Sequence, residues 1–329
     1  MARRPGSPTL APLDVDRLPR IHRSSAHLAG APMTMVRTGQ WYRVRRGAFV
    51  DADSVPDEPY ARRRAMALAA TVAVGRDLTE HRVVSHRSAA LLWGLRLVAL
   101  PTAVHTTGTV PPCDDHADDV VRHVSTVPDD DRTEIGGIPV TSLARTVRDC
   151  LLTADDGASA LVVLDAGLRA GLAPDEVAGQ VARAARRRGV RLARAVVPFG
   201  DDGAESVGES LARAALLALG LPSPLTQVRV RTAEGDYWSD LGWPEWRTLV
   251  EYDGQVKYTA DQGVQALLTE KRREDLLRGE GWTVLRLDRR DLRSDALLLE
   301  RLRRVLPPGA TAGLDPRPWF HRRSPRLAR

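Results

Sequence analysis

The sequence is poor in lysine and in cysteine. It contains 48 basic residues, yet only Lys257 and Lys271 are lysines. Arginine carries nearly all of the positive charge, which indicates a genomic bias against lysine. The two cysteines, Cys113 and Cys150, form neither a metal-ligand spacing nor a disulfide framework. This cysteine usage suits a reducing cytoplasm.

Long apolar runs are also lacking. No run approaches the ~20 residues that a membrane-spanning helix needs, and the N-terminus has no apolar core typical of a secretory signal. We therefore expect a cytoplasmic protein without a membrane segment. The composition, with 43% hydrophobic and 27% charged residues, is typical of a globular protein. The net charge of +6 favours a polyanionic partner, and nucleic acid is the polyanion that we expect.

The chain has 329 residues, which is enough for two or three domains. The Pro- and Arg-rich ends, 1–20 and 307–329, are expected to be disordered. The expected fold class is α/β (α+β). Glycine-bounded residues 200–203 mark a domain boundary, so that the pattern predicts three folded parts: a winged-helix-like unit over 21–58, a mixed and mainly helical middle region over 59–200, and a further domain over 204–306.

The last of these parts contains the most informative stretch. Apolar residues recur at helical spacing from Glu209 to Leu219, and Gly220 ends this helix. Strands are predicted over 236–241 and 248–252 on either side of a turn, so an antiparallel hairpin is expected. If the turn is centred between Glu245 and Trp246, opposed residue numbers sum to 491, and Asp240 faces Glu251.

Directly opposed carboxylates repel each other, and a cation would relieve the repulsion. The two-residue period of a strand puts Leu249, Glu251 and Asp253 on one face. Oxygen ligands of this kind suit Mg²⁺ or Mn²⁺, which can activate water and offset the charge of a phosphodiester. The alternative is that these acidic residues form a solvated edge of the sheet.

Several short runs in the last third of the chain resemble known nucleases. They are Glu209-Ser210 with Arg213, Gly220-Leu221-Pro222, Pro224 with Gln227, Asp240 ahead of Glu251-Tyr252-Asp253-Gly254, Lys271-Arg272, and Leu277-Arg278 with Gly281-Trp282. Together they are similar to domains related to the very-short-patch-repair (Vsr) endonuclease, which have a restriction-endonuclease-like fold with a mixed sheet flanked by helices.

The resemblance implies a metal-dependent DNA endonuclease. Asp240 and Glu251 would be metal ligands, and Glu209 a further ligand or a group that positions water. Asp253 is a further candidate catalytic residue, and it occupies the position where the wider fold has a catalytic lysine. Lys257 would then polarise the attacking water, with Lys271 as the alternative lysine.

The N-terminal part predicts a small DNA-binding unit. Helices are expected over 21–28 and 33–38, followed by the alternating strands of a wing over 41–50. This pattern resembles the N-terminal domain of AbiEi-type antitoxins, which act with a nucleotidyltransferase toxin and repress their own promoter. The candidate nucleic-acid contacts are Arg37, Arg43, Arg45 and Arg46, with Lys271 and Arg272 in the C-terminal domain. The alternative for the arginines is a solvated face.

The middle region contains no catalytic constellation. Its predicted helices cover 61–74, 86–95, 143–152, 158–170 and 174–187, and its strands cover 103–107, 120–125 and 137–141. Ser85 is expected to cap the second helix, with the adjacent His86 as a structural hydrogen-bonding residue. Arg145 and Asp149 are expected to pair on the surface of the third helix.

Two functions remain open at this stage. The first is a metal-dependent DNA endonuclease that uses Mg²⁺ or Mn²⁺. The second is a DNA-binding regulator without enzymatic activity, the antitoxin of a type IV toxin-antitoxin system with a toxin protein as partner. The acidic cluster discriminates between them, because a binding module gains nothing from carboxylates directed at phosphates without a metal.

Overall fold

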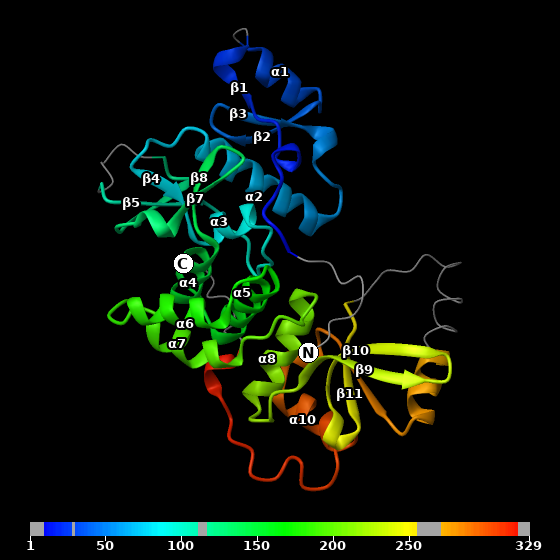
Figure 1. The fold of residues 1–329 in the computed structure, drawn as a ribbon. Coiled ribbons are helices and arrows are strands. Elements are labelled where there is room, and N and C mark those ends of the chain that lie inside the picture. The colour runs from blue at the N-terminus through cyan, green and yellow to red at the C-terminus, as the bar shows by residue number, and fades with distance from the viewer. Residues whose placement is uncertain (1–9, 28–29, 111–116, 255–270, 322–329) are drawn as a thin grey trace. The chain divides into compact units, whose positions relative to one another are not determined.

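The computed structural model describes residues 10–27, 30–110, 117–254 and 271–321 (Figure 1). The chain divides into two compact units. The N-terminal unit combines Leu10–Thr153 with Ala170–Arg187, and the C-terminal unit combines Ala154–Arg169 with the chain from Arg188 onward. Both contain helices and mixed sheets, which confirms the α/β (α+β) class. None of the described helices is both long and apolar enough to cross a membrane.

The N-terminal unit begins with a small sheet in the order β1-β3-β2. Its elements are β1 (His22–Arg23), a 3-10 turn (Ser24–Ala26), α1 (Ala31–Arg37), β2 (Trp41–Arg45) and β3 (Ala48–Asp51). The expected helix over 33–38 and the two strands of the wing are confirmed. The helix expected over 21–28 is wrong, because His22 and Arg23 pair with Phe49 and Ala48 as an edge strand.

Residues 10–20 are ordered, in contrast to the expected disordered tail. The backbone N–H of Leu13 donates to the carbonyl of Leu92 at 2.9 Å. Leu18 is buried in a hydrophobic cluster with Val72 and Ile138. Apolar side chains at Leu13 and Leu18 can anchor this segment despite its proline content, because burial of a leucine contributes about 1.5 to 3 kcal/mol.

A five-stranded mixed sheet forms the rest of the N-terminal unit, in the order β6-β5-β4-β8-β7. Its strands are β4 (Arg82–Val84), β5 (Val104–Gly108), β6 (Val120–Val124), β7 (Arg132–Ile135) and β8 (Ile138–Thr141). Its helices are α2 (Pro59–Gly75), α3 (His86–Leu92), α4 (Leu143–Leu152) and α6 (Pro174–Arg183). The cap of α4 is Ser142, whose Oγ accepts the N–H of Arg145. At the start of α3, by contrast, the Ser85 hydroxyl makes no cap bond.

The pair of Arg145 and Asp149 is buried, so the expectation of a surface pair is wrong. The Arg145 Nε lies 3.1 and 2.9 Å from the two carboxylate oxygens, and both residues are 2% exposed. Asp131, Arg148 and Gln180 join the same network. The helical spacing was read correctly, but α4 packs against α3 and α6, which cover that face of the helix.

The C-terminal unit begins with helices that pack on one another. They are α5 (Gly157–Arg169), α7 (Val190–Val196) and α8 (Val207–Ala218). α5 and α8 are joined by a buried ion pair, in which Arg213 donates to Asp165 at 2.5 Å. Ser210 donates to the other oxygen of Asp165 at 2.8 Å. Residues 200–203, the expected domain boundary, lie within this unit.

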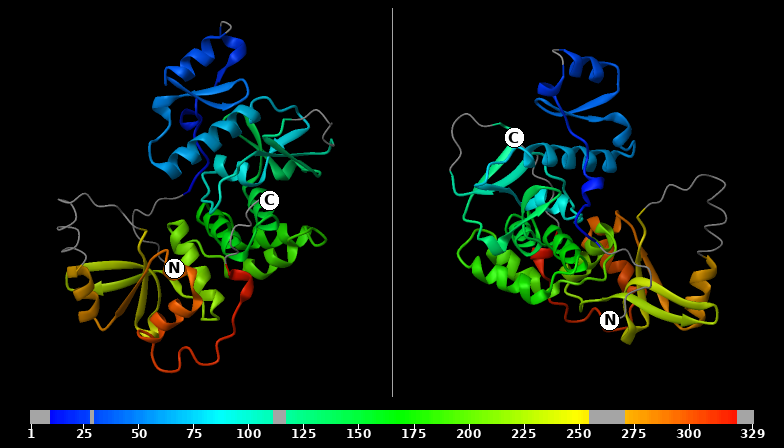
Figure 2. Two further views of the ribbon diagram at one scale, coloured as in Figure 1. Left: turned by 180° about the vertical axis from the view of Figure 1, so that it is seen from behind. Right: turned by 45° about the horizontal axis from the view of Figure 1, so that its top comes forward.

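A four-stranded mixed sheet follows, in the order β12-β11-β10-β9 (Figure 2). The strands are β9 (Leu225–Thr232), β10 (Gly235–Trp243), β11 (Thr248–Tyr252) and β12 (Thr283–Leu287). On one face, Leu241 and Val250 pack against α8 and α10 (Asp295–Arg303). On the other face, Leu249 packs with Leu277 of a helix whose described part covers residues 271–279.

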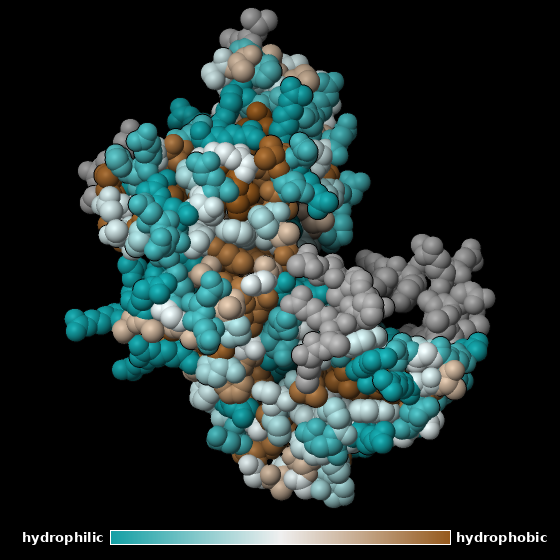
Figure 3. All heavy atoms as spheres, viewed as in Figure 1, coloured by the Kyte–Doolittle hydropathy of each residue, from teal (hydrophilic) through white to brown (hydrophobic). Residues whose placement is uncertain are grey.

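The described part of the C-terminal segment, residues 307–321, also packs on the unit, in contrast to the expected disorder. Arg317 donates from its backbone to the carbonyl of Ala218 and from its side chain to Leu217. Phe320 is buried edge-on against Phe199. Exposed hydrophobic side chains are spread over both units, and Figure 3 shows them on the visible face in small groups between hydrophilic residues.

Candidate functional site

The three carboxylates predicted to carry the chemistry come from one helix and two strands of the C-terminal unit. Glu209 is in the first turn of α8, Asp240 is on β10, and Glu251 is on β11. Gly208 allows the start of α8 to approach β11, because an added Cβ would lie 1.9 Å from the Tyr252 ring. The Glu209 carboxylate accepts the backbone N–H of Glu205 at 2.6 Å and is thereby held at the helix start.

The predicted hairpin register is confirmed. Leu241 pairs with Val250, Gly242 with Leu249 and Trp243 with Thr248, which is the register that a turn centred between Glu245 and Trp246 requires. The pairing ends one step before Asp240 and Glu251. There the Asp240 carboxylate accepts the Tyr252 N–H at 2.9 Å and takes the place of a backbone carbonyl.

This position makes Asp240 electrostatically unusual. Burial is the main cause that raises its pKa from 3.8 to about 6, and the nearby Glu209 carboxylate is the second cause. The hydrogen bond from Tyr252 and the charge of Arg273 act in the opposite direction. The protein therefore does not supply enough positive charge and hydrogen bonding to offset the negative charge of ionised Asp240. Such perturbed carboxylates are frequent at functional sites.

Glu251, by contrast, has strong cationic partners. Arg273 donates to its Oε1 at 2.6 Å, and the Arg286 Nε lies 3.9 Å from its Oε2. Arg273 also donates to the carbonyl of Trp238 at 3.0 Å, so its guanidinium bridges β10 and β11. The sequence predicted no arginine at this position, because Arg273 lies on a helix more than 20 residues beyond Glu251.

The remaining predicted residues of this site are dispersed. Asp253 follows β11 and donates its backbone N–H to Leu287. Lys257 lies outside the described residues, so its predicted role stays a prediction. Lys271 and Arg272 are exposed and line a depression of about 510 Å³, and Arg272 pairs with Glu234 at 2.7 Å.

The predicted N-terminal arginines do not share one environment. Arg37, Arg43 and Arg46 are exposed. Arg45 is half-buried and makes two hydrogen bonds of 3.0 Å to the carboxylate of Asp119. Three of the four guanidinium groups thus face solvent, where a phosphate could reach them.

Sequence reasoning missed a cluster of three histidines in the N-terminal unit: His86, His105 and His123. One ligand atom from each of the three rings lies within 4.8 Å of the other two, which is close enough to hold a metal ion. Within the described parts of the chain, no other group of three or more His, Cys, Asp and Glu side chains meets this criterion. The three carboxylates described above do not meet that criterion. The available signal was that His105 and His123 both fall within predicted strands, 103–107 and 120–125, but only the structure shows that these strands pair.

Two curated proteins similar to this chain carry no functional description. Two proteins of Mycobacterium tuberculosis, from two strains and both described as uncharacterized, are 36% identical to it over 157 residues. The aligned segment covers 47% of this chain and 57% of each relative, so the chain spans little more than half the length of the curated relatives that it matches. No family model matches the sequence.

Proposed function

We infer that the C-terminal unit is a metal-dependent nuclease that hydrolyses phosphodiester bonds in DNA. One observation carries this proposal: the partly buried Asp240 carboxylate, whose pKa is raised to about 6, has the Glu209 carboxylate as a close neighbour and lies beside the strand that bears Glu251. Such a concentration of negative charge destabilises the folded protein, and perturbed carboxylates of this kind cluster at functional sites.

The donor set fits a hard divalent cation such as Mg²⁺ or Mn²⁺. All three side chains offer carboxylate oxygens, which these ions prefer. Asp240 and Glu251 would hold the ion, with Glu209 as a further ligand or as the group that positions water. When bound, the cation supplies Lewis acidity and offsets the charge of the phosphate.

The protein's own residues then have separate tasks. Asp240 is held in position by the Tyr252 N–H. Arg273 orients Glu251 and adds a positive charge beside it, which favours the binding of an anionic phosphate. Lys271 and Arg272 are exposed at the start of the described part of the same helix and would contact the DNA backbone.

A second candidate function is a DNA-binding regulator without catalysis, and one observation favours it. Arg273 and Arg286 already compensate the Glu251 charge, as the ions of a structural pair would. In that case Arg37, Arg43 and Arg46 would supply the DNA contacts, and a toxin protein would be a partner, as the AbiEi-like pattern implies. For either function we propose a cytoplasmic location, in line with the cysteine usage.

The test is DNA cleavage by the purified full chain with Mg²⁺ or Mn²⁺. We expect metal-dependent cleavage by the parent and by Asp236→Asn, a matched control at an exposed aspartate of the same strand. Asp240→Asn should lose cleavage and keep DNA affinity. Loss of cleavage in both variants would contradict the assignment of Asp240, and a parent that binds DNA but never cleaves it would favour the regulator.

A further inference from the structure

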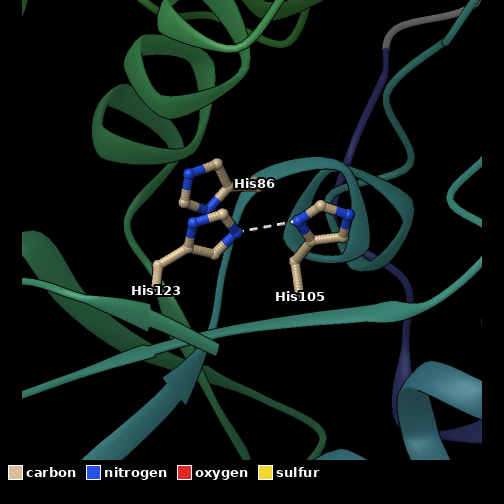
Figure 4. Close-up of side chains that lie close together, drawn as sticks. All are labelled: His86, His105 and His123. Carbon is tan, nitrogen blue, oxygen red and sulfur yellow. Dashed lines mark hydrogen bonds between the residues drawn. The ribbon is translucent and has the colours of Figure 1, made fainter. Parts of the chain in front are cut away.

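The histidine cluster is assembled from three elements of the N-terminal unit (Figure 4). His86 is the first residue of α3, His105 is on β5, and His123 is on β6. β5 and β6 are parallel, with Thr107 opposite His123, so His105 and His123 lie diagonally on one face of the sheet. The sheet and the start of α3 thus bring together residues that are 19 and 18 positions apart.

The rings approach closely and direct nitrogen atoms at each other. The Nδ1 of His105 is 2.9 Å from the Nε2 of His123. His86 stacks on His123, with ring centroids 3.7 Å apart and an interplanar angle of 17°. Two neutral imidazoles can share only one proton between facing nitrogens. A metal ion can instead use the lone pairs of both.

The backbone at His86 is strained. Its φ is 53°, a left-handed value that is uncommon for residues with a side chain. A helix start does not require this conformation. Strain of this kind is typical of ligand sites, where the position of one side chain matters more than local stability.

The neighbours of His86 fix the orientation of its ring. The Ser85 Oγ is 2.9 Å from the His86 Nδ1, and Thr107 donates to the same hydroxyl oxygen at 2.7 Å. When Nδ1 donates to Ser85, the Nε2 lone pair of His86 is left for a ligand. Metal-binding histidines are oriented by such a bond from the nitrogen that does not bind the metal.

The surroundings keep the three rings neutral, as metal ligation requires. Burial is the main cause that lowers the pKa of His105 to about 4, and it also lowers the pKa of His86 and of His123. The negative charge of Asp149 acts on the pKa of His123 in the opposite direction, and the positive charge of Arg187 lowers it.

We propose that His86, His105 and His123 form a binding site for one divalent transition-metal ion, and that this ion is Zn²⁺. Imidazole nitrogen is a ligand type that suits zinc. A tetrahedral zinc ion would hold its nitrogen ligands about 3.3 Å apart, given Zn–N bonds of about 2.0 to 2.1 Å. The present ligand atoms lie within 4.8 Å of one another, so shifts on the order of 1 Å complete the site.

Three protein ligands leave the fourth position of a tetrahedral ion to water or to an external ligand. The site is therefore of the open type and differs from four-ligand structural zinc sites. It is independent of the carboxylates of the C-terminal unit in both location and ligand chemistry. The two proposed sites thus suit different ions: the carboxylates suit a hard cation such as Mg²⁺, and the histidines suit a softer cation such as Zn²⁺.

The test uses the full chain, expressed without a polyhistidine tag, stripped with a chelator and titrated with Zn²⁺. We expect one high-affinity Zn²⁺ per chain by calorimetry and elemental analysis. His105→Ala and His123→Ala should lose this stoichiometric binding. Ser85→Ala should weaken it about 10- to 100-fold. His81→Ala, at an exposed histidine of the same unit, should match the parent.

Two further measurements keep the outcome decisive. X-ray absorption on the zinc-loaded parent should report about three imidazole nitrogens, and this result does not depend on whether any variant folds. Asp240→Asn should retain the Zn²⁺, which separates this site from the proposed nuclease site. Any of three results would overturn the proposal: a parent that binds no stoichiometric Zn²⁺, zinc that is coordinated only by oxygen, or unchanged Zn²⁺ binding in a folded His105→Ala variant.

Discussion

Asp240→Asn should stabilise the metal-free protein at neutral pH. Asn keeps the size of the side chain and a carbonyl oxygen that can accept the Tyr252 N–H. It removes the negative charge that is buried beside Glu209. Most substitutions of a buried hydrogen-bonding residue destabilise a protein, so a gain in stability would distinguish a functional carboxylate from a structural one.

The expected magnitude follows from the pKa of Asp240. The difference between 3.8 and about 6 corresponds to a destabilisation of about 3 kcal/mol when the carboxylate is ionised. Because the folded-state pKa is raised, the folded protein binds this proton more tightly than the unfolded chain, and stability falls as the pH rises through this window. The advantage of Asn is therefore absent near pH 4 and complete above pH 6 to 7.

The assay is thermal or urea unfolding at several pH values, followed by tryptophan fluorescence. Trp238, Trp243 and Trp246 lie in the same sheet region as Asp240 and report on this unit. A gain of up to about 3 kcal/mol corresponds to a rise in Tm of ~6 to 12 °C for a unit of this size. Asp236→Asn is the control, since that exposed carboxylate is paired with Arg229 and its pKa is lowered.

Two results would refute this reasoning. Asp240→Asn could be less stable than the parent at pH 7, which would mean that the hydrogen bond to Tyr252 requires the full charge. Alternatively, the difference between the two proteins could be the same at pH 4 and pH 7. In that case the titration of Asp240 would not be the cause.

Three further predictions concern the metal, the buried network and DNA. Millimolar Mg²⁺ or Mn²⁺ should raise the Tm of the parent by mass action and leave Asp240→Asn unchanged, and equal shifts in both would contradict the carboxylate site. Arg145→Ala should lower the free energy of unfolding by about 3 to 5 kcal/mol in urea titrations, because it removes a cation from Asp131 and Asp149. Its control is Arg304→Ala, in an exposed pair with Glu300, which should change this free energy by less than about 1 kcal/mol. Joint replacement of Arg43 and Arg46 by Ala should reduce the slope of log K against log salt by about 2 in fluorescence anisotropy with duplex DNA. Arg45→Ala, which breaks only the pair with Asp119, should leave that slope unchanged.

The hairpin register and several helix boundaries were determined by the sequence alone. The two-residue period of a strand puts Leu249 and Val250 on opposite faces of β11, and the turn position decides the hairpin partner of each residue. α4 runs from Leu143 to Leu152, as predicted, because Ser142 caps it and its apolar residues recur at helical spacing. These signals act between residues that are close in the chain, so a local pattern is sufficient to read them.

The environment of each charged group was decided only by the tertiary structure. Helical spacing pairs Arg145 with Asp149, but burial of that pair depends on how α4 packs against α3 and α6. Arg273 reaches Glu251 because a helix packs on the sheet. No residue near Glu251 in the sequence predicts this ion pair. The three histidines meet because β5 pairs with β6 beside the start of α3. Such contacts depend on pairings between segments that are distant in the chain. They are selected by the free energy of packing the whole unit, and no short run of residues determines them.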